Sequence, residues 1–73
     1  MPGTLQMFTI YERPTDYPNY FVVRRWEVSS GKPIPREIVL CPDLEYARLS
    51  IPRGLHCLPR HPGDMPSIVE TWL

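Results

Sequence analysis

Residues 20–28, Tyr20-Phe21-Val22-Val23-Arg24-Arg25-Trp26-Glu27-Val28, decide the fold of this chain. The stretch has no Gly, Pro, Asn or Asp, and it is rich in the β-branched and aromatic residues that fit a pleated, half-buried surface. It predicts the central strand of a sheet. Because neighbouring side chains of a strand point to opposite faces, Arg24 and Arg25 should lie on opposite sides of that sheet.

The other elements are separated by turn-forming residues and by ten prolines spread along the chain. Apolar residues alternate in most segments, as in strands, and recur at helical spacing in one. The order β-β-β-α-β-β predicts an α+β fold, in which a small mixed or antiparallel sheet of four to five strands has one short helix packed on one face. The predicted strands are residues 6–12, 20–28, 37–40, 55–58 and 67–73, and the predicted helix is 43–51.

The predicted helix begins at Asp43, a residue type that caps helix N-termini, and Gly54 is expected to cap its C-terminal end. Leu44, Ala47 and Ile51 share one face at helical spacing and should pack on the sheet. If the strands before and after the helix lie parallel, the connection between them is expected to be a right-handed crossover.

Size and charge limit the classes of protein that the chain fits. Its 73 residues form one domain, 1–73, with residues 1–5 predicted as a disordered tail and Met7 as an alternative start to Met1. Eight basic residues balance eight acidic ones, which disfavours nucleic acid as the partner because phosphate contacts need a basic excess. No apolar run is long enough for a membrane span and no signal peptide is visible, so we expect a cytoplasmic protein.

The two faces of the strand 20–28 differ in apolar content. Val22 and Trp26 lie on the more apolar face, which we expect to pack against the helix. Arg24 shares that face, and a buried arginine without a partner would cost several kcal/mol. We therefore expect Arg24 to form an ion pair with Glu12 or Glu70.

The opposite face carries the predicted functional surface. One short helix cannot cover both faces of the sheet, and we expect the uncovered face to expose Phe21, Val23 and Arg25. An apolar and aromatic patch beside an arginine is typical of a protein-binding surface. The sequence therefore predicts a non-enzymatic protein–protein interaction module that binds either another protein or, as a homodimer, a second copy of itself.

Single-stranded nucleic-acid binding is the alternative interpretation. Sheets of that class stack bases on strand aromatics and bind phosphates with arginines. Tyr20, Arg24 and Trp26 would form such a face here. The consensus of the RNA-recognition motif is absent, and the zero net charge weakens this alternative further.

Metal binding and catalysis are both disfavoured by residue spacing. Cys41, His56, Cys57 and His61 match the ligand count of tetrahedral zinc, but they form neither a C-x-x-C nor an H-x-x-x-H pattern. A cysteine nucleophile beside a histidine would lack a third, orienting group. We therefore predict no metal, no cofactor and no catalytic residue, and we expect Cys41 and Cys57 to be free thiols.

Four runs carry a family resemblance: residues 8–11 (FTIY), 16–18 (DYP), 21–26 (FVVRRW) and 68–72 (IVETW). Together they resemble a family of small, uncharacterised bacterial proteins, and the similarity covers nearly the whole chain from Met7 onward. The resemblance implies a bacterial origin and a small protein that functions on its own. It carries no activity, ligand or catalytic residue.

Overall fold

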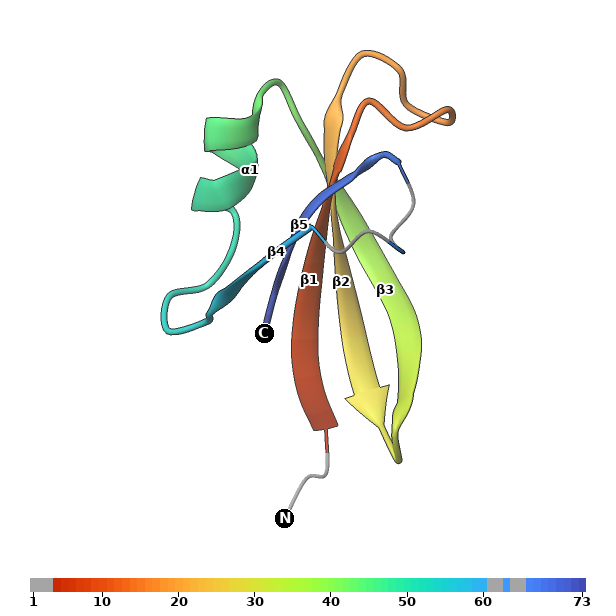
Figure 1. The fold of residues 1–73 in the computed structure, drawn as a ribbon, viewed down its shortest axis with the longest axis vertical. Helices are drawn as coiled ribbons and strands as arrows, with labels where there is room; N and C mark the ends of the chain where they lie inside the picture. The colour runs from red at the N-terminus through yellow and green to blue at the C-terminus, as the bar shows by residue number, and fades with distance from the viewer. Residues whose placement is uncertain (1–3, 61–62, 64–65) are drawn as a thin grey trace.

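The computed structural model describes residues 4–60, 63 and 66–73. It contains one five-stranded sheet and one short helix (Figure 1). The strands lie in the order β3-β2-β1-β5-β4, and every neighbouring pair is antiparallel. The elements are β1 (Thr4–Glu12), β2 (Phe21–Ser29), β3 (Lys32–Cys41), α1 (Leu44–Leu49), β4 (Cys57–Pro59) and β5 (Ile68–Trp72).

This arrangement confirms the predicted α+β class, with five strands, one helix and a sheet that dominates the fold. One detail of the predicted topology is wrong. The strand predicted to be central, β2, has neighbours on both sides, but β1 is the middle strand of the five. The helix α1 connects β3 and β4, which lie at opposite edges of the sheet and run in the same direction, and the handedness of this connection stays a prediction.

Two strands are longer than predicted. Thr4 and Leu5 belong to β1, so the predicted tail is wrong for these residues, whereas residues 1–3 lie outside the described part. The strand predicted at 37–40 begins at Lys32, because β2 and β3 are joined by the two residues Ser30 and Gly31. Their φ angles of 53° and 76° are the left-handed conformation that a tight hairpin turn requires.

Prolines are tolerated in β3 because it is an edge strand. Pro33 and Pro35 both lie within the strand and both pair with β2. A proline has no N–H to donate, so it fits a strand where its nitrogen faces solvent and not a neighbouring strand. The predicted edge position of Pro35 is confirmed.

The helix is shorter than predicted, but its first turn is as expected. Asp43 is the N-cap, and its Oδ1 accepts a hydrogen bond from the backbone N–H of Tyr46 at 2.8 Å. Ser50 forms the C-cap, so the prediction that Gly54 does so is wrong. Among the described residues, no helix is long and apolar enough to cross a membrane.

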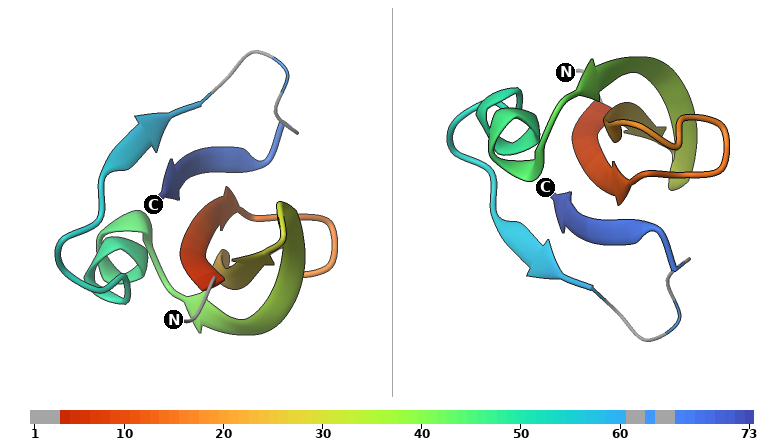
Figure 2. Two further views of the ribbon diagram at one scale, coloured as in Figure 1. Left: turned by 90° about the horizontal axis from the view of Figure 1, so that it is seen from below. Right: turned by 90° about the horizontal axis from the view of Figure 1, so that it is seen from above.

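The core forms between α1 and one face of the sheet. The end-on views show the three long strands coiling strongly, with the helix beside them (Figure 2). Phe21, Leu44, Leu55, Val69 and Trp72 pack around the buried residues. The buried members of this core are Phe8, Ile10, Val23, Cys41, Ala47 and Ile51.

The helix covers the face of β2 that was expected to be exposed. Val23 is only 3% exposed, and Phe21 packs against the core, so the expectation that both are displayed is wrong. The physical reason is the length of α1: six residues extend over about 9 Å. The helix therefore covers one end of this face, where Phe21 and Val23 lie, and leaves the end with Arg25 and Glu27 uncovered.

Candidate functional site

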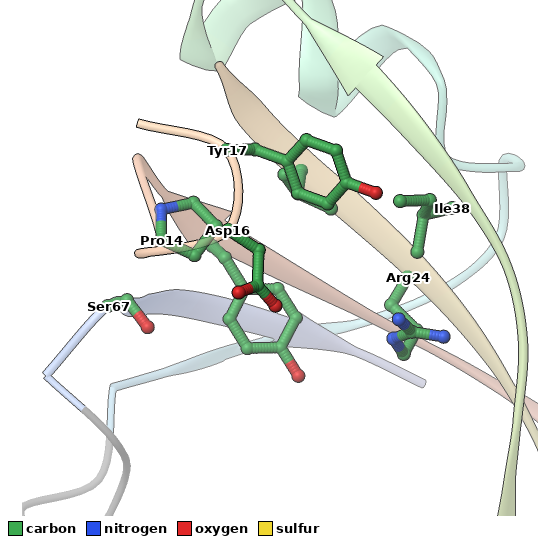
Figure 3. Close-up of a pocket in the computed structure, with 8 residues that line it drawn as sticks. Pro14, Asp16, Tyr17, Arg24, Ile38 and Ser67 are labelled. Carbon is green, nitrogen blue, oxygen red and sulfur yellow. The ribbon is translucent and has the colours of Figure 1, made fainter. Parts of the chain in front are cut away.

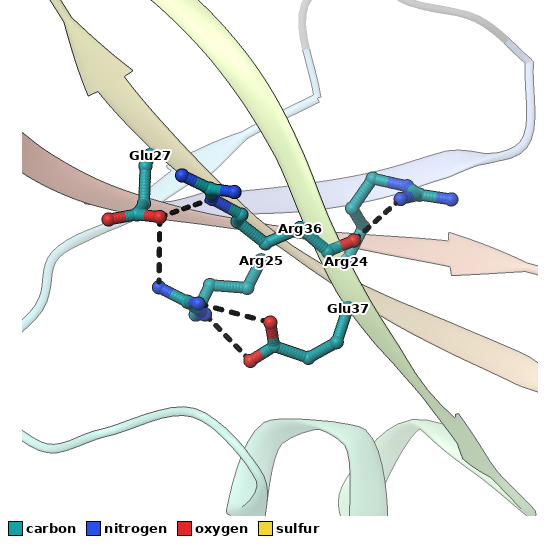
Figure 4. A network of polar contacts seen from close by, with 5 residues as sticks. All are labelled: Arg24, Arg25, Glu27, Arg36 and Glu37. Atoms are coloured by element: carbon teal, nitrogen blue, oxygen red, sulfur yellow. Dashed lines mark hydrogen bonds and ion pairs between the residues drawn. The ribbon is translucent and has the colours of Figure 1, made fainter.

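Arg24 and Arg25 lie on opposite faces of the sheet, as predicted. Arg25 stands opposite Phe8, on the core face, and is held by a carboxylate of the neighbouring edge strand. Its Nε donates to Oε2 of Glu37 at 2.7 Å, and its Nη2 donates to Oε1 at 3.0 Å (Figure 4). Arg25, which was predicted to be displayed to a partner, is therefore held in an ion pair, so this prediction is wrong.

A β-bulge in β3 explains why Arg25 is held. Arg24 pairs with Ile38 and Trp26 pairs with Pro35, so two residues of β3, Arg36 and Glu37, stand opposite Arg25. Such a bulge lets two successive side chains reach the same side of the strand.

The bulge completes a network of alternating charges. Arg36 binds Glu27, and Arg25 Nη1 lies 4.0 Å from the same Glu27 carboxylate (Figure 4). The Arg25 guanidinium, through its hydrogen bonds, lowers the pKa of Glu37 to about 2. All four side chains of this network already have an ion-pair partner, so few of their charged groups are available to bind a ligand.

Arg24 forms no ion pair with any described residue, so its predicted pairing with Glu12 or Glu70 is wrong. Its Nη1 donates to the backbone carbonyl of Arg36 at 2.8 Å. Its guanidinium carbon lies 6.0 Å from the ring centroid of Trp26, within reach of a cation–π contact.

Glu70 instead binds the helix. Arg48 donates to both carboxylate oxygens, at 2.9 and 3.1 Å, and Trp72 Nε1 donates to Oε1 at 3.1 Å. Glu70 is only 7% exposed, and the hydrogen bonds from Arg48 keep its pKa below the usual value. This ion pair connects α1 to β5. Arg48, and not Arg24, is therefore the arginine that pairs with Glu70.

Arg24 borders a small pocket at the end of the sheet where the β1–β2 connection folds back (Figure 3). The pocket has a volume of about 210 Å³. Burial raises the pKa of Tyr11, and the charge of Arg24 opposes this shift. The lining residues are Tyr11, Pro14, Asp16, Tyr17, Val22, Arg24, Ile38 and Ser67.

The structure brings together only part of the predicted nucleic-acid face. Arg24 and Trp26 are in contact, and Trp26 Nε1 donates to Thr9 Oγ1 at 3.1 Å. Tyr20 is 43% exposed and precedes β2, but it is not among the residues that line the pocket beside Arg24.

A larger, apolar cavity lies beside the N-terminal half of β1, and we call it the β1 groove. Its volume is about 550 Å³. Leu5 is 70% exposed and Leu73 is 47% exposed, so two apolar side chains of the groove face solvent. The groove is lined by Leu5, Gln6, Met7, Val28, Leu55 and Leu73.

The sequence reasoning missed the β1 groove because its walls come from both ends of the chain, from β2 and from the segment before β4. The register between β1 and β2 places Leu5 opposite Val28 and Met7 opposite Trp26. A local signal was available: residues 4–10 (TLQMFTI) contain no charge and alternate apolar residues on one face. The predicted tail, residues 1–5, includes the start of this stretch.

The two cysteines lie in different environments. Cys41 is buried, and its Sγ lies 3.9 Å from Ser50 Oγ, whereas Cys57 is exposed. Partial desolvation of the sulfur and the nearby Glu70 carboxylate both raise the pKa of the Cys57 thiol, which disfavours the thiolate. Within residues 4–60, 63 and 66–73, no three His, Cys, Asp or Glu side chains form a group that could hold a metal ion. His61 lies outside the described residues.

Comparison with known proteins gives no match to a family model, a curated protein or a solved structure. The resemblance to small bacterial proteins therefore stays a prediction, and the residues of the chain carry the functional argument.

Proposed function

We propose that this chain is a non-enzymatic protein–protein interaction module and that its contact surface is the β1 groove. The observation that carries the proposal is an apolar cavity of about 550 Å³ beside β1, with Leu5 and Leu73 exposed at its walls. Apolar hollows with exposed aliphatic side chains are where protein partners bind, because their burial is favourable.

The backbone beside the groove adds hydrogen-bonding capacity. Among the described residues, β5 pairs with β1 only from Phe8 to Tyr11. The segment from Thr4 to Met7 therefore has a strand neighbour, β2, on one side only. An extended peptide placed there would gain main-chain hydrogen bonds from the strand and apolar contacts from the groove, which is the usual mode of strand addition.

The exposed apolar residues of the helix are less suited to this role. Tyr46 and Leu49, on the helix, are 53% and 81% exposed, but neither lines a described cavity. Isolated exposed apolar residues are common on protein surfaces and need no functional explanation.

Selection from a library of random peptides, followed by NMR mapping, tests this function. We expect selected peptides to shift the amide resonances of Met7, Val28 and Leu73. Leu5→Lys should weaken their binding, because the charge would enter an apolar wall. Leu49→Lys is the matched control, since it changes a comparably exposed leucine outside the groove and should leave binding unchanged.

Failure to select any binder, or shifts confined to the helix, would contradict the proposed surface. Equal effects of the two lysine substitutions would also contradict it, because they would indicate a general effect of charge.

Single-stranded nucleic-acid binding at Arg24 is the second candidate. The observation that favours it is a guanidinium without a carboxylate partner among the described residues, 6.0 Å from the ring centroid of Trp26 and bordering the pocket with Tyr11 and Tyr17. A mixed-sequence oligonucleotide at low salt should shift the resonances of Arg24 and Trp26, and Arg24→Gln should reduce the affinity. Unchanged shifts at these residues would exclude this candidate.

A further inference from the structure

We infer that the partner of the β1 groove is a second copy of the chain, bound by antiparallel pairing of the two Thr4–Gln6 segments. This inference rests on the proposed function and names the occupant of the same surface. Three features of the sheet support it: the direction of the backbone groups, the side chains along the edge of β1 and the protection of the edge at β3.

A hydrogen bond at the C-terminal end of β1 shows to which side the backbone N–H and C=O groups of Thr4 and Gln6 point. The N–H of Glu12 donates to the carbonyl of Ser67, on the side of β5, at 2.7 Å. The pairing of β1 with β2 is continuous from Thr4 to Glu12, so alternate residues point their N–H and C=O groups to the same side. Gln6 and Thr4 therefore present these groups to the side of β5, where the described strand pairing ends at Phe8.

An antiparallel edge of this kind is complementary to its own copy. With Leu5 on the two-fold axis, Gln6 of each copy lies opposite Thr4 of the other. These two pairs exchange four main-chain hydrogen bonds, because each residue of a hydrogen-bonded pair donates one and accepts one. The two Leu5 side chains then meet as a non-hydrogen-bonded pair, in which side chains approach most closely.

The charges along the edge permit this pairing. Residues 4–10 carry no charge, so no like charges meet across the two-fold axis. Leu5 is 70% exposed in the single chain, and pairing would bury it against its copy and the groove.

The outer edge of the sheet shows the protection that β1 lacks. In β3, Pro33 and Pro35 offer no N–H, and the bulge at Arg36 and Glu37 interrupts the edge with charged side chains. Prolines, bulges and charges are the usual means by which proteins prevent pairing at sheet edges. The exposed edge of β1 carries none of them from Thr4 to Met7.

Sedimentation equilibrium of the chain tests this inference, over about 10 to 500 μM because so small an interface should associate weakly. We expect a mass that rises from 8.5 kDa towards twice that value. Gln6→Pro removes the N–H that faces the partner and keeps every hydrogen bond to β2, so it should weaken self-association at least about tenfold. Gln6→Thr keeps this N–H and should leave self-association unchanged.

Leu5→Lys is a second variant, to be used if circular dichroism shows that Gln6→Pro does not fold. It places two like charges at the two-fold axis and should also abolish self-association. A wild-type chain that stays at 8.5 kDa would overturn the inference, as would self-association that survives both Leu5→Lys and a folded Gln6→Pro. Peptide selection at the groove is read independently, so a monomer that binds peptides there would refute self-pairing and leave the proposed function standing.

Discussion

Replacing Glu70 with Gln should loosen the attachment of the helix to the sheet. The Glu70 carboxylate is 7% exposed and accepts three hydrogen bonds, two from Arg48 and one from Trp72. A glutamine keeps one acceptor oxygen and turns an NH₂ group towards the donors of Arg48. Hydrogen bonds to a charged group contribute about 1.5–3 kcal/mol, so we expect the free energy of unfolding to fall by about 2 kcal/mol.

Thermal denaturation followed by circular dichroism measures this effect. For a domain of this size, a loss of about 2 kcal/mol corresponds to a decrease in Tm of about 8–16 °C. Glu37→Gln is the matched control, because Glu37 also binds an arginine through both oxygens but has a side chain that is 62% exposed. Exposed ion pairs contribute little, so its Tm should change far less. Equal changes in the two variants would refute the claim that burial makes the Glu70 contact important.

Three further predictions concern the pH dependence of stability, the core and the turn between β2 and β3. The pKa values of Glu70 and Glu37 are lower in the folded chain than in the unfolded one. The contribution of these two carboxylates to the free energy of unfolding is therefore present above about pH 4.5 and is lost as the pH falls through their folded pKa values. Urea denaturation between pH 7 and pH 2 should show this loss, and Glu70→Gln should flatten it. Val23→Ala should lower the free energy of unfolding by about 2 kcal/mol in the same assay, because Val23 is in the core, and an unchanged stability would contradict its burial. Gly31→Val should destabilise the chain by about 1 kcal/mol or more, because valine is strained at a φ of 76°, and an unchanged Tm would contradict the turn geometry.

The sequence was informative where local chemistry determines structure. Asp43 marked the start of the helix through its capping side chain, and the spacing of Leu44 and Ala47 identified the face of that helix that packs on the core. Alternation along residues 20–28 placed Arg24 and Arg25 on opposite faces. Each of these features depends on residues within a few positions of one another.

The assignment of faces failed because it treated each face as uniform along its length. The face with Phe21 and Val23 also carries Arg25 and Glu27, and it was judged the more polar one. In the structure the helix covers only its apolar end, and a bulge in β3 supplies the partners for its charged end. The position of a bulge depends on the register between two strands, which residues 20–28 alone do not specify.

The full lining of the β1 groove could not be predicted from the sequence, for a related reason. Leu5, Val28 and Leu73 meet there only because β1 lies between β2 and β5 and extends beyond the last paired residue of β5. Strand order determines this meeting. Periodicity within a segment does not show which strands become neighbours.

An isotope-filtered NOE experiment on a mixture of labelled and unlabelled chains tests the central claim most directly. The claim is that the open half of β1 and its groove form the contact surface with a second copy. The account predicts intermolecular NOEs between the Leu5 methyl groups and between the backbones of Gln6 and Thr4. Intermolecular NOEs confined to Tyr46 and Leu49 on the helix, or none at concentrations where sedimentation shows a dimer, would contradict it.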